Sequence, residues 1–296
     1  MQDLHLNNIT IDPLSFPLFT SKELHVDVLR LDKIHPDISG NKWFKLRYYL
    51  EDAIAENKKT MVTWGGAWSN HILATAAACK MNGLHSIGII RGEAPANPSP
   101  TLLRAKEMGM QLIFVDRQTY SDEKIPAELN STEYFFIPAG GYGITGAKGA
   151  ATIHDHYKDN DYTHICCAAG TGTMAAGLIN ASLPGTELVV ISVLKNNIDL
   201  ENDITRLTVN TKTNFSILHD HHFGGYAKYT DELVDFMNEF YRQTSIPSDF
   251  VYTGKLFFAI KDLIQKDFFS PGSRLLLIHS GGLQGNASFG KGKLIF

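Results

Sequence analysis

The stretch HICCAAGTGTMAAGL, residues 164–178, contains the pattern that decides the fold. A short apolar strand, residues 164–167, runs into a loop of glycine and threonine, and a helix of small residues, 175–178, follows. Backbone N–H groups in such a loop, with the helix dipole behind them, form a binding site for an anion. The loop lacks the Lys-Ser/Thr ending of a nucleoside-triphosphate loop and the full spacing of a dinucleotide fingerprint. The pattern therefore favours a small phosphate group as ligand, and a plain turn is the alternative.

Apolar, strand-like runs alternate with helical patterns on both sides of this stretch. Strands are expected at residues 60–63, 84–90, 111–115, 134–137, 188–194 and 275–279, and helices at residues 70–81 and 101–108. Strands that alternate with helices indicate βαβ units and parallel sheets, so we predict an α/β fold. The Gly-rich segment 138–149 is expected to be either a connection between domains or a loop of the site.

The composition is that of a globular protein with a sizeable core. The chain has 296 residues, of which 44% are hydrophobic and 20% charged, and its formal net charge of −4 is spread without long runs of one sign. A nucleic-acid or membrane-surface binder usually has a basic face, so neither partner is expected. Three cysteines cannot form a disulfide framework, and the first twelve residues lack the pattern of a signal peptide. We therefore expect a soluble, cytoplasmic protein.

A pair of lysines early in a predicted helix is a candidate for chemistry. The segment SGNKWFKL, residues 39–46, places a Ser-Gly-Asn turn before a helical pattern, with Lys42 and Lys45 near its first turn. The helix macrodipole disfavours cations at this end, so the protonated form of a lysine there is disfavoured. Schiff-base chemistry needs such a neutral amine. Two solvated lysines on a surface helix are the alternative.

Two further segments follow strands as the 168–174 loop does. WGGAWSNH, residues 64–71, has paired glycines after a strand and then a Ser-Asn pair where a helix would be capped, and a cap without other function is the alternative. IHSGGL, residues 278–283, is a buried strand that runs into glycines. Ligands bind outside the carboxyl ends of parallel strands, which is where all three segments are predicted. We therefore expect them to contribute to one site.

Together these segments resemble the 1-aminocyclopropane-1-carboxylate deaminase / D-cysteine desulfhydrase family. The similar segments follow the family's order: GNK at 40–42 with KL at 45–46, GGAWSNH at 65–71, AAGTGTMAAGL at 168–178, VYTGK at 251–255 and HSGG at 279–282. Members are pyridoxal-phosphate enzymes with the tryptophan synthase β-subunit fold (fold type II), so the resemblance implies two α/β domains with parallel or mixed sheets. The larger, cofactor-binding domain would comprise residues 1–50 and 157–296, and the smaller, inserted domain residues 51–156. A homodimer is also expected.

The resemblance implies which residues bind pyridoxal 5'-phosphate. Lys42 would hold the cofactor, whose conjugated ring acts as an electron sink. Asn70 would bond the 3' oxygen of the ring, and Ser280 would contact the cofactor as well. The phosphate would be held by the glycine-threonine loop and one lysine: Gly170, Thr171, Gly172, Thr173 and Lys45.

The resemblance also implies catalytic and substrate-binding residues. Besides Lys42, the catalytic residues would be Ser69, which would accept a proton or anchor the substrate's carboxylate, and two tyrosines, Tyr226 and Tyr252, which could ionise or relay a proton. The substrate, a small amino acid, would be contacted by Trp68, Ser69, Asn70 and His71. Without the motifs around them, the two tyrosines would be interpreted as core or surface aromatics.

Departures from the family pattern bear on the substrate. Trp68 stands where a glutamine is usual, and Phe44 where a basic residue is usual. The cyclopropane deaminases have a glutamate and a leucine at the positions of Thr253 and Ser280. A carboxylate beside the pyridine nitrogen keeps that nitrogen protonated, whereas a hydroxyl leaves it largely neutral, which suits easier eliminations. The sequence therefore favours a D-cysteine desulfhydrase-like α,β-elimination that gives pyruvate and ammonia, with 1-aminocyclopropane-1-carboxylate deamination as the alternative.

Two readings from other classes stay open at this point. A non-catalytic carrier or sensor of pyridoxal phosphate would need the lysine and the phosphate loop but not Ser69 together with both tyrosines. A metal protein is conceivable because His219, His221 and His222 cluster. Their spacing is not that of a zinc site, so no metal is expected.

Overall fold

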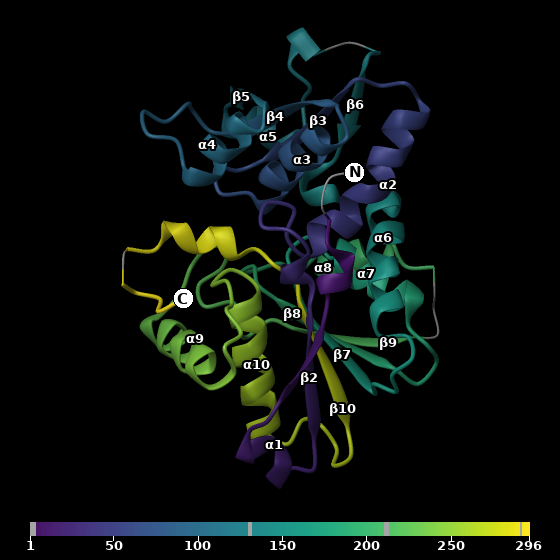
Figure 1. Cartoon of the computed structure of the whole chain (residues 1–296), viewed down its shortest axis with the longest axis vertical. Coiled ribbons are helices and arrows are strands. Elements are labelled where there is room, and N and C mark those ends of the chain that lie inside the picture. The colour runs from purple at the N-terminus through teal and green to yellow at the C-terminus, as the bar shows by residue number, and fades with distance from the viewer. Residues whose placement is uncertain (1–3, 130–131, 210–212, 291) are drawn as a thin grey trace.

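The computed structural model describes residues 4–129, 132–209, 213–290 and 292–296, and two β-sheets organise them (Figure 1). The larger sheet has six strands in the order β1-β2-β10-β7-β8-β9. Its strands are β1 (Ile11–Leu14), β2 (His25–Arg30), β7 (His164–Ala169), β8 (Glu187–Ser192), β9 (Asn214–Leu218) and β10 (Arg274–His279). All neighbours pair in parallel except β1 with β2, which are antiparallel. The larger sheet is therefore mixed.

The smaller sheet has four parallel strands in the order β5-β4-β3-β6. They are β3 (Thr60–Gly65), β4 (His85–Arg91), β5 (Gln111–Val115) and β6 (Tyr134–Ile137). Strands and helices alternate through both sheets, and the predicted α/β fold class is confirmed.

Helices cover the sheets and connect them. The α-helices are α1 (Pro17–Ser21), α2 (Asn41–Ala55), α3 (Asn70–Met81), α4 (Pro100–Glu107), α5 (Arg117–Ser121), α6 (Ile144–Ala151), α7 (Thr173–Ala181), α8 (Leu200–Thr205), α9 (Asp231–Thr244) and α10 (Thr253–Gln265). Short 3-10 helices lie at Leu6–Asn8, Leu31–Ile34, Ala127–Leu129, Ala139–Gly141, Thr152–His156 and Leu283–Ser288. Local chemistry sets several of their ends, since the hydroxyls of Ser69, Ser99 and Thr230 each accept a hydrogen bond from a backbone N–H of the first turn.

Two apolar layers lie on opposite faces of the larger sheet. One layer, between the sheet and α10, includes Val28 and Phe257. The other contains residues of α2, α6 and α7 and continues as far as Met61 of the smaller sheet, so one core joins both sheets. Small residues allow the helices of this second layer to pack closely: a Cβ on Gly177 of α7 would lie 2.5 Å from the carbonyl oxygen of Ala147 in α6. The small-residue composition of α7 is thus a packing requirement.

One backbone contact positions the start of α2. Gly40, the residue before the helix, has a φ of +63°, and a Cβ there would lie 1.9 Å from the carbonyl oxygen of Ser280. The same carbonyl accepts a hydrogen bond from the backbone N–H of Asn41 at 3.1 Å. Only glycine fits a left-handed conformation this close to another strand's backbone. The contact fixes Lys42 next to the carboxyl end of β10.

Each strand and helix predicted above is found, with ends shifted by one or a few residues. Several elements were not predicted, among them β1, β2, β9 and the two long helices α9 and α10. The division into a larger domain (1–50 and 157–296) and a smaller domain (51–156) stays a prediction. The four strands of the smaller sheet all fall within the second of these ranges.

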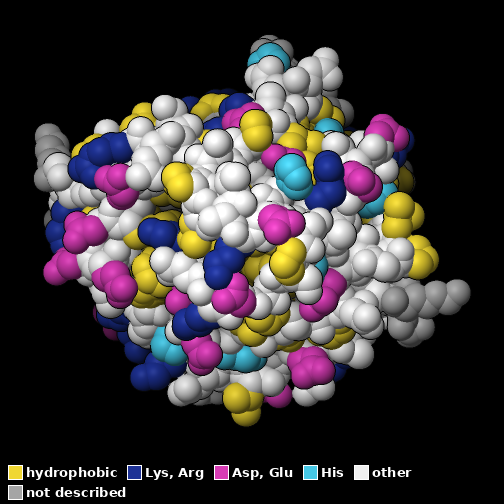
Figure 2. Space-filling view, turned by 90° about the horizontal axis from the view of Figure 1, so that it is seen from below, with side chains coloured by type: hydrophobic (Ala, Val, Ile, Leu, Met, Phe, Trp, Pro, Cys, Tyr) yellow, Lys and Arg dark blue, Asp and Glu magenta, His cyan; other side chains and the backbone are white. Residues whose placement is uncertain are grey.

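The surface and the helices give two further observations. Within the described ranges, the helices are too short or too polar to cross a membrane. Basic and acidic side chains are interspersed on the end of the molecule farthest from the smaller sheet (Figure 2).

Candidate active site

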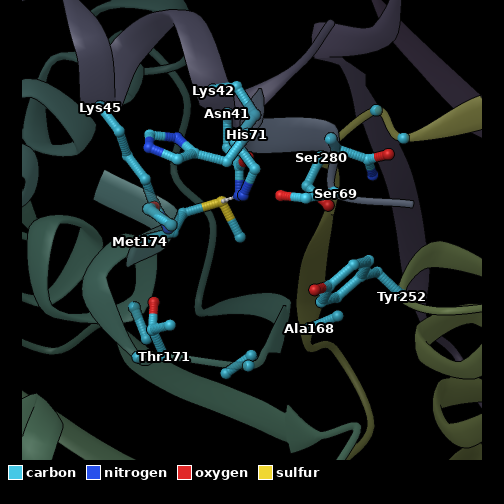
Figure 3. A pocket seen from close by; sticks show the side chains of 18 of the residues that line it. Asn41, Lys42, Lys45, Ser69, His71, Ala168, Thr171, Met174, Tyr252 and Ser280 are labelled. Atoms are coloured by element: carbon cyan, nitrogen blue, oxygen red, sulfur yellow. Dashed lines mark hydrogen bonds between the residues drawn. The ribbon is translucent and has the colours of Figure 1, made fainter. Parts of the chain in front are cut away.

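A cavity lies where the carboxyl ends of β7 and β10 meet the beginnings of α2, α3 and α7 (Figure 3). All but two of the predicted site residues line it, the exceptions being Trp68 and Thr173. The lining residues that were predicted are Lys42, Lys45, Ser69, Asn70, His71, Gly170, Thr171, Gly172, Tyr226, Tyr252 and Ser280. The fold therefore brings together six stretches of the sequence that are far apart in the chain.

Lys42 is the second residue of α2 and is half-buried in the cavity. Burial lowers the pKa of its ammonium group to about 8, although the Asp249 carboxylate acts in the opposite direction. Its side chain forms no ion pair or hydrogen bond with any described residue. An amine that is neutral in an appreciable fraction near neutral pH and has no protein partner is suited to react with a carbonyl group.

Lys45 and His71 lie deeper in the same cavity. Lys45 is 4% exposed, and its Nζ lies 3.5 Å from the carbonyl oxygen of Gly140. Burial, and then the charge of Lys42, hold the pKa of Lys45 well below its ordinary value. Burial and both lysines likewise lower the pKa of His71, whose Nε2 lies 2.9 Å from the Thr63 hydroxyl, so the imidazole is neutral at neutral pH. The concentration of positive charge here favours an anionic ligand, which would raise the pKa of both lysines.

The glycine-threonine loop is at the N-terminus of α7. Gly172, in the left-handed conformation with φ of +76°, precedes the helix, and Gly170, Thr171 and Gly172 line the cavity. Thr173 does not line it, because its side chain is fully buried and its hydroxyl lies 3.1 Å from that of Thr171. The first turn of α7 leaves backbone N–H groups without helical partners, and these point towards the cavity end of the helix. The loop can therefore bind an anion through its backbone and the Thr171 hydroxyl.

Ser69 and Asn70 form the start of α3. The Ser69 hydroxyl accepts a hydrogen bond from the Ile72 backbone N–H at 3.4 Å, so Ser69 caps α3, as its sequence pattern indicated. Ser69 also lines the cavity. The Oδ1 atom of Asn70 is buried without a hydrogen-bond partner. A buried amide oxygen usually has a donor, so this atom is available to accept from a ligand.

The two tyrosines differ in exposure. Tyr252 lies beside the loop, with its ring 3.5 Å from where a Cβ on Gly170 would be, and Tyr226 is partly exposed at the mouth. Burial raises the pKa of Tyr226, and it raises the pKa of Tyr252 well above its ordinary value. Both phenols are therefore protonated at neutral pH. The expectation that one of them ionises finds no support in these surroundings.

Asp249 is a charged residue near the site that the sequence interpretation missed. Its carboxylate is fully buried and accepts hydrogen bonds from the backbone N–H groups of Val251, Tyr252 and Thr253 and from the Thr253 hydroxyl, at 2.8–2.9 Å. The hydroxyl of Thr253 is thus directed to Asp249, and Thr253 does not line the cavity. An aspartate shortly before a helix is a capping signal, which could have identified Asp249.

Trp68 lies outside this cavity. Its side chain lines an adjoining one, together with Asn70, Tyr226 and Tyr252, which belong to both. Other residues that were not predicted line the main cavity, among them Asn41, whose amide lies 3.3 Å from the sulfur of Met174. Gly140, in the Gly-rich segment 138–149, also lines it, so that segment contributes to the site.

The histidine cluster has other partners. His221 pairs with Asp262 at 2.9 Å through Nε2, and Nδ1 of His222 accepts from the Gly224 backbone N–H at 2.9 Å. In the part of the chain that the structure describes, no group of three or more His, Cys, Asp or Glu side chains is arranged to hold a metal ion.

Comparisons with known proteins agree with this geometry. The sequence model of the family described as "Pyridoxal-phosphate dependent enzyme" matches residues 13–281. A Pyrococcus abyssi protein named "Putative 1-aminocyclopropane-1-carboxylate deaminase" is 28% identical over 94% of this chain and 91% of its own. The "Bifunctional D-cysteine desulfhydrase/1-aminocyclopropane-1-carboxylate deaminase, mitochondrial" of Arabidopsis thaliana is 28% identical over 84% of this chain and 70% of its own. A crystal structure of an "ACC deaminase homologue" superposes with a TM-score of 0.81 at 27% identity, covering 96% of this chain and 92% of that one.

Proposed function

Because this chain belongs to the family of pyridoxal-phosphate dependent enzymes, we propose that it is a lyase that eliminates a β-substituent from a small D-amino acid. The products would be pyruvate, ammonia and the released substituent, as for D-cysteine. The names of two relatives, one a D-cysteine desulfhydrase and both 1-aminocyclopropane-1-carboxylate deaminases, support these two chemistries as the candidates.

The cavity fits pyridoxal phosphate. Two lysines without carboxylate partners among the described residues, a helix N-terminus with free N–H groups and an unpartnered buried amide oxygen are all on its wall. Lys42 would hold the cofactor covalently, and the phosphate would lie against the Gly170–Gly172 loop with Lys45 as its positive partner. Asn70 would bond the ring, and Ser280 would contact its other end. When bound, the cofactor supplies an electron sink for negative charge on the substrate's α-carbon.

The remaining side chains handle protons and orient the substrate. Lys42, with its pKa lowered to about 8, can hold a proton or release it near neutral pH. The Ser69 hydroxyl, at the start of α3, would bind the substrate's carboxylate, or would take the α-proton while passing its own proton to the neutral amine of Lys42. Tyr252 is buried and protonated, so it would donate a hydrogen bond, and neutral His71 would contact the substrate from α3. These roles are compatible with catalysis. A protein that only carried the cofactor would not need side chains that transfer protons or bind a substrate.

One observation supports the choice of elimination: no Asp or Glu side chain of the described residues lines the cavity, whereas the hydroxyl-bearing Ser280 does. The buried carboxylate near the site, that of Asp249, already accepts hydrogen bonds from residues 251–253. Without a carboxylate at its nitrogen, the cofactor ring stays largely neutral and is a weaker electron sink. Loss of a good leaving group from the β-carbon requires less stabilisation than the opening of a carbon ring. The names of the relatives nevertheless make 1-aminocyclopropane-1-carboxylate deamination the second candidate.

The test is an assay of purified holoenzyme against both enantiomers of cysteine and β-chloroalanine and against 1-aminocyclopropane-1-carboxylate. We expect pyruvate from the D-amino acids and no 2-oxobutyrate from the cyclopropane. The variant Lys42→Ala should lose at least about a thousandfold in kcat, since it removes the covalent anchor. Release of 2-oxobutyrate without pyruvate from any D-amino acid would contradict the proposal and favour the second candidate.

Location and assembly belong to the same proposal. A cytoplasmic enzyme is supported by three cysteines that are free and buried. A homodimer is supported only by the frequency of twofold assemblies among soluble enzymes. Size-exclusion chromatography with light scattering measures the assembly directly.

A further inference from the structure

Half of the residues that line the cavity beside the active site are aromatic. Its lining residues are Trp68, Asn70, Tyr226, Ala227, Tyr229, Phe250, Val251, Tyr252, Gly285 and Ser288. We call it the aromatic chamber. Its volume is about 270 Å³. A cavity of roughly 150 Å³ with apolar walls is large enough to bind benzene, so this chamber has room for an aromatic ring.

The aromatic chamber adjoins the cavity of the candidate active site. Asn70, Tyr226 and Tyr252 line both spaces. Tyr252 lies beside Ser69 and Ser280 at one side of the main cavity (Figure 3). The two spaces therefore share part of their walls, and a substituent on a substrate bound in the main cavity has the chamber as a neighbouring space to enter.

The walls of the chamber select for a neutral, apolar group. No Lys, Arg, Asp or Glu side chain of the described chain lines it. A charged substituent would lose its hydration there without gaining a partner. Trp68 and Tyr229 are 37% and 38% exposed, although aromatic side chains gain free energy when they are covered.

The far wall of the chamber is rigid. The ring of Phe250 packs edge-on against Tyr229, with centroids 5.5 Å apart, and against Phe289 at 4.6 Å. Phe250 is 3% exposed, so its ring is fixed by the core. A preformed wall lowers the entropic cost of binding a ring against it.

We propose that the aromatic chamber is the subsite for the substrate's β-substituent, and that it takes a bulky, neutral, aromatic or aliphatic group. The inference rests on the proposed function and specifies its substrate class. Preferred substrates are D-cysteine thioethers such as S-benzyl-D-cysteine. In the reaction the α-proton leaves, the bond from the β-carbon to sulfur breaks with its electron pair on sulfur, and the thiolate takes up a proton. Water then converts the resulting 2-aminoacrylate to pyruvate and ammonia.

The first experiment compares substrates on the wild-type holoenzyme. We expect kcat/KM for S-benzyl-D-cysteine to exceed that for D-cysteine by about tenfold or more, which is the range that small apolar groups give in enzyme pockets. An equal or lower value would overturn the inference. Because D-cysteine turnover would still be measured, the proposed function would survive that result.

Variants then test whether the aromatic chamber causes the expected preference for S-benzyl-D-cysteine over D-cysteine. Trp68→Gln restores the polar residue of the family pattern, and Ser288→Phe fills the chamber. Both should lower the ratio of the two kcat/KM values about tenfold. Leu183→Gln is the matched control, because Leu183 is exposed in the loop between α7 and β8, away from the site. If the control alters the ratio as much as the chamber variants do, the chamber is not the subsite.

A binding measurement does not depend on turnover. D-phenylalanine and D-alanine have no β leaving group, and they differ by one phenyl ring. By calorimetry on the holoenzyme, D-phenylalanine should bind at least about tenfold more tightly than D-alanine, and Trp68→Gln should remove most of that difference. Equal affinities would overturn the inference. A failure of every amino acid to release pyruvate would instead defeat the proposed function, and the binding measurement could still be made.

Discussion

Burial of Lys42 has a cost in stability that would accompany its proposed reactivity. The ammonium group has no carboxylate partner among the described residues, and burial lowers its pKa from 10.5 to about 8. A buried group that prefers to lose its charge destabilises the folded state while it remains charged. The fold tolerates this cost at the position where we propose that the amine reacts.

The cost can be measured on the apoprotein with Lys42→Met. Between pH 8 and 10.5 the unfolded chain binds a proton that the folded chain has lost, so this lysine makes stability rise with pH across that window. At pH 7 the methionine variant should therefore be more stable than the wild type by about 2–3 kcal/mol, and the difference should shrink by pH 9.5. Urea unfolding at both pH values gives the free energies.

The exposed Lys59, changed to methionine, is the control for the loss of a lysine. A stability difference between Lys42→Met and the wild type that is the same at both pH values, or absent at pH 7, would mean that the ammonium is not desolvated.

At the scale of elements, a buried lysine of α10 fixes the loop that carries Tyr226. Lys255 is fully buried, and its Nζ donates hydrogen bonds to the carbonyl oxygens of His222 and Gly225, both at 2.8 Å. Phe223 and Ala227 have φ of +51°, a conformation that costs non-glycine residues about 1 kcal/mol or more. Lys255 therefore holds a strained loop in the shape that presents Tyr226 to both cavities.

Lys255→Met should release this loop. Each hydrogen bond from a charged donor contributes about 1.5–3 kcal/mol, so local opening should become at least tenfold more frequent. Hydrogen exchange of a peptide covering residues 222–228 should accelerate accordingly, and KM should rise more than kcat falls. Lys261→Met, on the exposed side of the same helix, is the matched control. Unchanged exchange in the Lys255 variant would show that other contacts hold the loop.

The sequence predicted best those strands and helices whose formation leaves a pattern in the local sequence. Continuous apolar strands such as β8 and β10 were predicted because burial on both faces leaves a local signal. β2 (HVDVLR) was missed because polar residues interrupt its apolar pattern, and β1 contains a proline that an edge strand tolerates. In the site, glycine loops after strands identified most lining residues. The Thr253 hydroxyl is directed to Asp249, four residues earlier, and the capping signal there was overlooked. Trp68 lines a cavity together with Tyr226 and Tyr229, and no local pattern connects these residues to it.

At the scale of the whole molecule, the cofactor would contact helices and strands that come from distant parts of the sequence. One apolar core includes Phe44 of α2, Met61 of the smaller sheet and Cys167 of the larger sheet. The cavity adds contacts from the starts of three helices to the end of β10. A ligand that binds only this folded arrangement shifts the unfolding equilibrium towards it.

Removal of pyridoxal phosphate should therefore lower the melting temperature. A cofactor present at a hundred times its dissociation constant stabilises by about 2.7 kcal/mol, which corresponds to roughly 4–5 °C for a chain of 296 residues. Differential scanning fluorimetry of the apoprotein, before and after cofactor is added, measures the shift. Pyridoxal without phosphate should give a clearly smaller shift, because the loop at Gly170–Gly172 would have no anion to bind. Equal shifts would contradict the assignment of the phosphate site.

The strand order of the larger sheet has a consequence for how the protein is made. β10 pairs with β2 on one side and β7 on the other, so strands from both ends of the chain are neighbours. The four strands of the smaller sheet leave the ribosome as a continuous segment, whereas β2 emerges long before β10. At about 5–20 residues per second, the interval lasts on the order of ten seconds or more. During that time β2 and β7 have unpaired edges of the kind that chaperones protect from aggregation. A nascent chain that stops before Arg274 contains Lys42 but never acquires the strand beside whose end that lysine lies in the folded protein.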